Sequence, residues 1–178
     1  MTTPTLNELM QTLPQTGTLT WIGLRPGRGE PMVACDSARV EPGLGLEGDR
    51  FRGRPQSKRQ VTLIQAEHLP VIGSLLHRDT PDPGLIRRNL VVSGVNLLAL
   101  KGRCFRIGEV MLEMTGLCHP CSKMETLFGP GGYNSLRGHG GITARVLEGG
   151  QIRRGDPVSV CEPDTGDCPT RNPDHADK

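Results

Sequence analysis

Residues 110–128 read VMLEMTGLCHPCSKMETLF, and the spacing of their apolar side chains changes halfway along the segment. From Val110 to Met114 apolar residues occupy alternate positions, which predicts a β-strand with one or both faces covered. From Met124 to Phe128 they recur three and four positions apart, which predicts a short helix that ends before Gly129. Residues 116–121, GLCHPC, therefore join a predicted strand to a predicted helix.

The cysteine at the end of this junction is the first candidate for chemistry. Pro120 is suited to the first turn of the helix, where a missing N–H costs nothing, and Cys121 then follows it directly. The unpaired N–H groups and the positive end of the helix dipole favour a thiolate there. A thiolate attacks sulfur or binds a soft metal. The alternative is that Cys121 is only a small buried residue in a tight turn.

The rest of the chain predicts a fold rich in short strands. The 178 residues include 24 Gly and 15 Pro, which indicates many turns, and so few aromatic residues that the core must consist of aliphatic side chains and Met. Strands are expected at residues 17–24, 32–40, 60–65, 85–93, 104–107, 110–115, 142–147 and 158–160, and helices at residues 5–13, 66–76 and after Cys121. We predict a mostly β protein, a closed or nearly closed β-barrel with two or three short α-helices.

Three regions are expected along the chain. Residues 1–18 form an N-terminal helix and lead-in, residues 19–161 a single barrel domain, and residues 162–178, which are nearly free of apolar side chains, a disordered C-terminal tail.

Composition limits the classes of partner and compartment. The net charge of +2 gives no reason to expect a polyanionic partner, and the scarcity of aromatic residues leaves little on which to stack nucleic-acid bases. The sequence lacks a secretion signal and any run of about 18 apolar residues, so we expect a cytoplasmic protein without a membrane anchor. Six cysteines in that setting favour free thiols, a metal site or a redox motif over a disulfide framework.

Glycine and arginine gather in three further segments. Residues 41–58 surround GLGLEGDR (43–50), which matches neither a phosphate-binding P-loop nor a dinucleotide fingerprint, and they form either a mobile surface loop or a binding loop. Within the strand expected at 85–93, Arg87, Arg88 and Asn89 either present donors to a ligand or face solvent at a sheet rim. His139 lies in a glycine-rich loop after Arg137, where it either reaches a ligand or is simply exposed.

Taken together, these motifs resemble the MOSC domain family, which occurs at the carboxyl end of molybdenum cofactor sulfurases and as stand-alone proteins. The resemblance runs from about residue 21 to residue 160 and is carried by the order of the motifs Leu24-Arg25-Pro26, Gly45-Leu46-Glu47-Gly48-Asp49-Arg50, Arg87-Arg88-Asn89-Leu90, Arg106-Ile107-Gly108, Cys118-His119-Pro120-Cys121 and Arg137-Gly138-His139-Gly140-Gly141.

The resemblance implies a barrel-like fold and one functional cysteine, which corresponds to Cys121. In this family that cysteine is thought to carry sulfur as a persulfide or to ligate the molybdenum of a pterin cofactor, molybdopterin. A soft thiolate suits such a metal, and guanidinium groups suit the cofactor's phosphate. The implied cofactor-binding residues are Arg50, Arg87, Arg88, Asn89, Arg137 and His139, with Asn89 either contacting the pterin or bracing its loop.

The resemblance also implies partners. The chain has no pyridoxal-phosphate domain, so a sulfur carrier of this kind needs a separate sulfur donor such as a cysteine desulfurase. An oxidoreductase that reduces N-hydroxylated compounds needs a separate electron-donor protein, because no flavin, haem or iron–sulfur motif is present. Cys118 makes the junction a Cys-x-x-Cys, which keeps open a thiol-redox or zinc-binding barrel protein without molybdenum.

Overall fold

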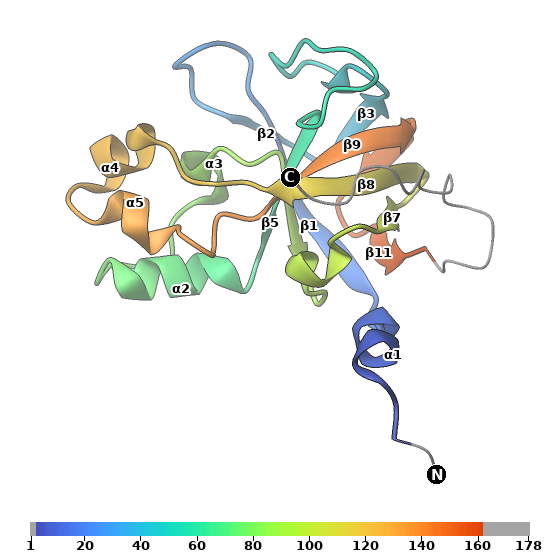
Figure 1. Ribbon diagram of the computed structural model, residues 1–178. Helices are drawn as coiled ribbons and strands as arrows, with labels where there is room; N and C mark the ends of the chain where they lie inside the picture. Colours follow the sequence, from blue (N-terminus) through green and yellow to red (C-terminus); the bar gives the residue numbers. More distant parts are fainter. Residues whose placement is uncertain (1–2, 162–178) are drawn as a thin grey trace.

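The computed structural model describes residues 3–161, and its central element is a closed barrel of seven strands (Figure 1). The strands follow the order β11-β7-β8-β9-β5-β6-β1 around the barrel, and pairing of β11 with β1 closes it. Neighbouring strands are antiparallel except β5 and β6, which are parallel. Their bounds are β1 Gly17–Leu24, β5 Val61–Gln65, β6 Leu90–Ser93, β7 Cys104–Ile107, β8 Val110–Leu117, β9 Ile142–Glu148 and β11 Pro157–Val160. The expectation of a mostly β barrel is confirmed.

A short second sheet lies at the edge of the barrel. It has the order β10 (Gly150–Arg153), β3 (Ser37–Glu41), β4 (Gly45–Leu46). The single strand expected at residues 32–40 is therefore wrong, because the chain bends at Asp36 and separates β2 (Val33–Cys35), which pairs with β1, from β3. Only Gly149 separates the end of β9 at Glu148 from the start of β10 at Gly150.

Two apolar clusters explain why β5 and β6 are covered on both faces. Leu63 and Leu90 point into the barrel core, whereas Ile64 and Val91 belong to a second cluster outside it. Because successive side chains on a strand point to opposite faces, the adjacent apolar residues Leu63-Ile64 and Leu90-Val91 require cover on both sides of the sheet. The outer cluster packs the helices against the barrel.

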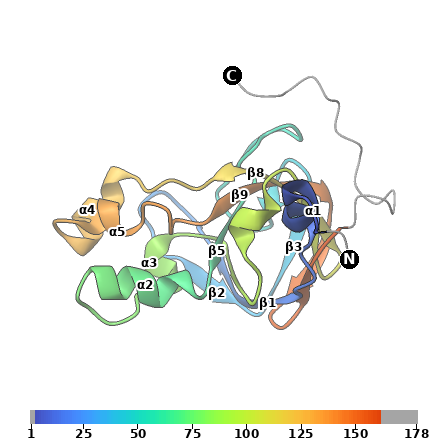
Figure 2. The ribbon, with the colours of Figure 1, turned by 60° about the horizontal axis from the view of Figure 1, so that its bottom comes forward.

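These helices lie together on one side of the barrel in both views (Figures 1 and 2). They are α2 (His68–Leu75), α3 (Pro83–Ile86), α4 (Ser122–Phe128) and α5 (Gly132–Ser135), and their buried side chains include Ile72, Ile86, Met124 and Phe128. A 3₁₀ turn, η1, spans Leu97–Leu100. Within residues 3–161 there are five α-helices rather than two or three, because α3 and α5 are single turns of four residues.

The remaining helix, α1 (Leu6–Gln11), extends from the start of β1 away from the helical side (Figure 1). Its start is as expected: the Thr5 hydroxyl accepts a hydrogen bond from the Glu8 N–H, and the Glu8 carboxylate accepts one from the Thr5 N–H. None of the helices in residues 3–161 has both the length and the hydropathy needed to cross a bilayer. The tail expected at residues 162–178 lies outside the described residues.

Candidate functional site

Cys121 lies where the chain passes from the barrel to the helical side. β8 ends at Leu117, and Cys121 is the N-cap of α4 with extended backbone dihedrals (φ −124°, ψ 170°). Pro120 therefore precedes the helix instead of occupying its first turn, and Cys121 caps the helix instead of lying within it. Its side chain is exposed and makes no capping hydrogen bond. The thiol is thus fixed at a helix start and open to a ligand.

Cys118 has the opposite environment. It is buried, its N–H donates to the Gly141 carbonyl (2.8 Å), and its own carbonyl accepts from Arg88 Nη2 (3.2 Å). Both cysteines are free thiols, and residues 118–121 form neither a turn nor a bend. Figure 1 shows the chain running on from β8 toward α4 without doubling back. A disulfide needs Cα atoms within about 7 Å, so this extended path does not favour a dithiol pair.

Arg88 lies beneath this segment and joins three parts of the chain. Its Nε donates to the Gly140 carbonyl (2.7 Å), Nη1 to the Ile86 carbonyl (2.9 Å) and Nη2 to the Cys118 carbonyl. It is 7% exposed, and none of the ion pairs within residues 3–161 involves it. Burial lowers the pKa of Arg88, while the nearby Cys118 and Cys121 thiols act in the opposite direction. Arg88 is therefore a buried cation close to both cysteines, and its hydrogen-bond partners within residues 3–161 are carbonyl oxygens.

The strand expected at residues 85–93 is wrong in its first half. Leu85 and Ile86 belong to α3, Arg87 has a left-handed backbone (φ 62°), and β6 begins only at Leu90. This break in the strand lets consecutive arginines diverge. Arg87 is half-buried, and its Nη1 donates to the Glu30 carbonyl (2.7 Å) on the neighbouring loop, away from the acceptors of Arg88.

Asn89 is fully buried and braces the barrel end rather than facing a ligand. Its amide nitrogen donates to the Gly23 carbonyl (3.2 Å) and to Asp49 Oδ1 (3.0 Å), and its amide oxygen accepts from the Thr62 N–H and hydroxyl. Asp49 is 1% exposed and pairs through both oxygens with Arg25. Asn89 is expected either to contact the pterin or to brace its loop, and these contacts match the bracing role. Sequence reasoning missed the partnership of Arg25 and Asp49.

The loop that follows Asp49 carries five basic residues and no acidic one. Arg50, Arg52, Arg54, Lys58 and Arg59 are all exposed, and none forms an ion pair within the described part of the chain. We call residues 50–59 the basic loop. Arg59 is near enough to Arg88 to influence its pKa, and the Lys58 carbonyl accepts a hydrogen bond from the Thr115 hydroxyl on β8. The basic loop therefore flanks the strand that leads to the cysteines.

The basic loop is anchored rather than free. Buried Gln60 accepts a hydrogen bond from the Gly43 N–H (2.9 Å) and donates to the carbonyls of Pro55 (2.8 Å) and Ser57 (3.0 Å). Gly45 has φ +69°, and a Cβ atom there would lie 2.4 Å from the Gln60 carbonyl oxygen. Glycine at this position therefore permits a close approach of two backbones.

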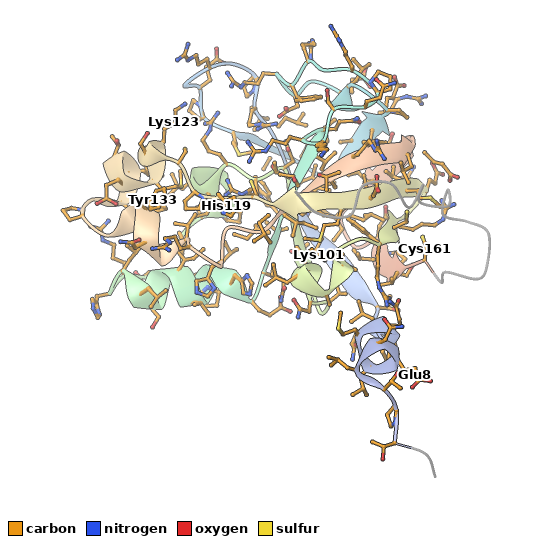
Figure 3. All side chains as sticks on the ribbon, viewed as in Figure 1. Glu8, Lys101, His119, Lys123, Tyr133 and Cys161 are labelled. Atoms are coloured by element: carbon orange, nitrogen blue, oxygen red, sulfur yellow. The ribbon has the colours of Figure 1, made fainter. Side chains whose placement is uncertain are left out.

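A cleft of about 530 Å³ opens beside the cysteines. It is lined by His119 and Pro120 from the junction, Tyr133 from α5, and Arg137 and Gly138 from the loop that follows, and Figure 3 labels His119 and Tyr133 on the helical side. Arg137 is exposed. A larger cleft of about 890 Å³ lies at the far end of α4, beside Leu127 and Phe128, but none of the predicted site residues lines it. The smaller cleft is the better candidate because His119 and Pro120, the residues between the two cysteines, line it.

His139 follows the lining residues Arg137 and Gly138 in the chain and packs against His68, the first residue of α2. Its ring packs edge to face on His68, with ring centroids 5.3 Å apart and planes at 74°. The Nδ1 atoms of both rings are buried without a hydrogen-bond partner among the described residues. Burial and the neighbouring His139 lower the pKa of His68, and Glu67 acts in the opposite direction.

The structure thus brings together most of the predicted site. Cys121, Arg88, Arg137 and the loop of His139 surround one junction, whereas among the described residues no hydrogen bond or ion pair joins the side chain of Arg50 or Arg87 to it. Within residues 3–161 no group of three or more His, Cys, Asp or Glu side chains could hold a metal ion, which leaves a four-ligand zinc site without ligands in that part of the chain.

Comparison with solved structures shows the same fold elsewhere. The YuaD protein from Bacillus subtilis superimposes with a TM-score of 0.72 at 18% identity, covering 84% of this chain and 98% of that one. YiiM from Geobacillus stearothermophilus gives 0.64 at 18% identity over 84% and 77% of the two chains. YiiM from Escherichia coli gives 0.62 at 19% identity over 81% and 69%.

Sequence comparison supplies the family. No curated protein sequence gives a significant match. The family model for the MOSC domain matches residues 47–159, a span that begins before Asp49, contains the basic loop, Arg88 and both cysteines of the junction, and ends in β11. On this match over more than half of its length, the chain belongs to the MOSC domain family.

Proposed function

We propose that this protein binds the molybdenum cofactor and uses Cys121 as a molybdenum ligand or sulfur carrier. The observation that carries the proposal is the pairing of an exposed, free thiol with a buried guanidinium that has no carboxylate partner within the described residues. A thiolate is a soft ligand of the kind that the molybdenum of a pterin cofactor accepts. When bound, the cofactor would supply a metal centre for oxygen or sulfur transfer.

The residues around Cys121 fit an anionic cofactor. A buried cation is costly unless a negative group compensates it, and Arg88 has only carbonyl dipoles. Arg59 adds positive charge on the same side, and Arg137 lines the cleft with an exposed guanidinium. Arg137, together with the basic loop that begins at Arg50, would donate hydrogen bonds to the cofactor's phosphate.

The roles of the other predicted residues follow from their contacts. Arg88 would hold the backbone of the cysteine junction while its charge favours a negative group nearby. Asn89 would act indirectly, by bracing Asp49 and the loop beyond it. Arg87 keeps a half-buried guanidinium with one bond to Glu30, so it would contact only a ligand that extends toward that loop. His139 would support the cleft wall from behind.

We propose that the site carries out one of two activities, either reduction of N-hydroxylated compounds or sulfur transfer. Either needs a second protein, which would donate electrons in the first case and sulfur in the second. The thiol-redox alternative is less well supported, because the chain makes no turn between Cys118 and Cys121 and the two thiols have opposite exposures.

The test is the metal and pterin content of freshly purified protein. We expect molybdenum by elemental analysis and an oxidised pterin by fluorescence, with little zinc. Cys121→Ser should lose most of the molybdenum, whereas Cys118→Ser, the matched control three residues away, should keep most of it. Equal loss in both variants, accompanied by stoichiometric zinc in the wild type, would overturn the proposal.

The same protein distinguishes a sulfur carrier from a metal ligand. Iodoacetamide should label exposed Cys121 much faster than buried Cys118 in the folded protein, as followed by mass spectrometry of the peptide. A peptide that carries one additional sulfur atom on Cys121 before labelling would indicate sulfur transfer. Faster labelling of Cys118 would show that the wrong thiol has been assigned.

A further inference from the structure

The contact between His68 and His139 joins the start of α2 to the loop that follows α5. His68 is the first residue of α2, which follows β5, and His139 lies in the loop between α5 and β9. Besides the ring contact with His68, the His139 N–H donates to the Leu136 carbonyl (3.0 Å) within the same segment. The edge-to-face contact therefore links the loop to α2, next to the apolar packing of Leu136 in the cluster that contains Ile72.

The loop held in this way, residues 137–141, contributes to the site at three points. Arg137 lines the cleft, the Gly140 carbonyl accepts from Arg88 Nε, and the Gly141 carbonyl accepts from the Cys118 N–H. A displacement of the loop would remove one wall of the cleft and two hydrogen bonds that fix the cysteine junction.

We propose that His68 is a positioning residue: in its neutral form it packs against His139 and holds residues 137–141 in the arrangement that forms the cleft. This proposal rests on the proposed function at one point, namely that the cleft is the cofactor site. The two buried Nδ1 atoms make the ring contact sensitive to protonation, because neither atom has a hydrogen-bond acceptor among the described residues. A proton on either atom would be buried without a partner, and protons on both rings would add repulsion.

The charged groups around the pair make the direction of the pH effect clear. Glu67 precedes His68 and favours its protonated form, but its carboxylate already accepts from the Gly94 N–H (2.6 Å) and from Gln65. On the other side, Arg88 contacts the loop through Gly140 and faces the two cysteine thiols, and Arg137 adds a second cation. The pKa of His68 is lowered by burial and by His139, so neutral His68 is favoured in the folded state.

The sign of the pH dependence follows. A histidine with a lowered pKa in the folded state contributes stability that is complete above its ordinary pKa of about 6.5 and is lost as the pH falls below that value. We therefore expect the loop to be held at neutral pH and released on mild acidification.

Amide hydrogen exchange of residues 137–141 and of Cys118 tests this, measured at about pH 7.5 and about pH 5 and corrected for the intrinsic rate. In the wild type, protection should fall by up to about tenfold for each pH unit below about 6.5. His68→Phe keeps an aromatic ring that cannot be protonated, so its protection should stay high at both values. His68→Ala removes the contact and should give low protection at both.

A matched control and an internal reference complete the design. His77→Asn changes a histidine beyond the end of α2 that has a left-handed backbone, which Asn tolerates, and should behave like the wild type. Amides of the β1–β6 pairing report global unfolding, so equal losses there would mark a variant that does not fold.

Two outcomes would overturn the proposal. One is an unchanged pH dependence in His68→Phe, and the other is normal protection in a folded His68→Ala variant. Because hydrogen exchange needs no bound cofactor, a wild type that binds no molybdenum but shows the expected exchange would refute the proposed function and leave the positioning role intact.

Discussion

Replacing Asp49 with Asn should destabilise the barrel more than any surface charge change. Oδ1 of Asp49 accepts from the Arg25 N–H (2.7 Å), Arg25 Nε (3.0 Å) and Asn89 Nδ2 (3.0 Å), and Oδ2 accepts from Arg25 Nη2 (2.8 Å) and the Phe51 N–H (3.0 Å). An amide of the same shape would direct an NH₂ group at existing donors and leave Arg25 without its counter-charge.

The magnitude follows from burial. Asp49 is 1% exposed, and breaking a buried ion pair by removing one partner costs about 3–5 kcal/mol. Against a typical unfolding free energy of about 5–15 kcal/mol, this is a large fraction. At about 2–4 °C per kcal/mol for a chain of this size, the melting temperature should fall by about 6–20 °C. Urea titration followed by circular dichroism, together with a thermal scan, measures both quantities.

The pH dependence gives the prediction a second test. Burial alone would raise the pKa of Asp49, but hydrogen bonds and the charge of Arg25 outweigh it and lower the pKa. The contribution of Asp49 is therefore complete above the ordinary aspartate pKa of about 3.9 and is lost as the pH falls from there through the lowered value. The difference between wild type and variant should stay constant from about pH 7 to about pH 5 and narrow below about pH 4.

Glu41→Gln is the matched control. The Arg39–Glu41 pair has a comparable distance (2.7 Å), but its side chains are 60% and 42% exposed, so its loss should cost less than about 1 kcal/mol. The reasoning would be refuted by Asp49→Asn destabilising no more than this control, or by a difference that does not narrow in acid.

Two further predictions concern the backbone around the cysteine junction. Arg88→Met should lower the free energy of unfolding by about 3 kcal/mol or more, since three buried carbonyls lose their hydrogen-bond donor. Arg87→Met loses one hydrogen bond and should lower it by less than about 1.5 kcal/mol. The same urea titration measures both values. Gly141→Ala places a Cβ atom 1.9 Å from the Leu63 carbonyl oxygen, while Gly131→Ala meets nothing within 4 Å, although both glycines have positive φ. Both variants should lose about 1–2 kcal/mol from backbone strain, and only Gly141→Ala should lose substantially more. Equal losses within either pair would contradict these contacts.

Local patterns were sufficient to predict the elements that carry the site. The alternation before Leu117 and the helical spacing after Cys121 place the thiol at a strand-to-helix junction, which the structure confirms. The strand predicted at residues 60–65 is likewise confirmed, as β5. These predictions succeed because the period of burial is set by strand and helix geometry, independently of what covers them.

The strand predicted at residues 85–93 shows where periodicity misleads. Ile86 matches a period of two with Leu90 and Val92. However, the Asp82 carboxylate accepts from the Gly84 N–H and Pro83 occupies the first turn, so a single helical turn forms instead. Asp-Pro before an apolar pair is a helix-start signal, and it could have moved the start of the strand to Leu90.

The polar network and the histidine pair could not be predicted from any local pattern. Asn89 is 40 residues from Asp49 and 64 from Arg25, and His68 is 71 residues from His139. The barrel brings these side chains together only after seven strands have closed, so their pairing is a property of the register and not of sequence spacing.

The balance of buried charge explains why the two cysteines differ in role. Asp49 neutralises Arg25, which leaves Arg88 as the buried cation without a carboxylate among the described residues. Both thiols lie near that charge, but the Cys118 thiol is enclosed and its backbone is already bonded to Gly141 and Arg88. Only Cys121 combines the field of Arg88 with an open path to solvent. Under the proposed function, a negative ligand drawn to this field would meet Cys121, and Cys118 would serve by holding the backbone from which Cys121 projects.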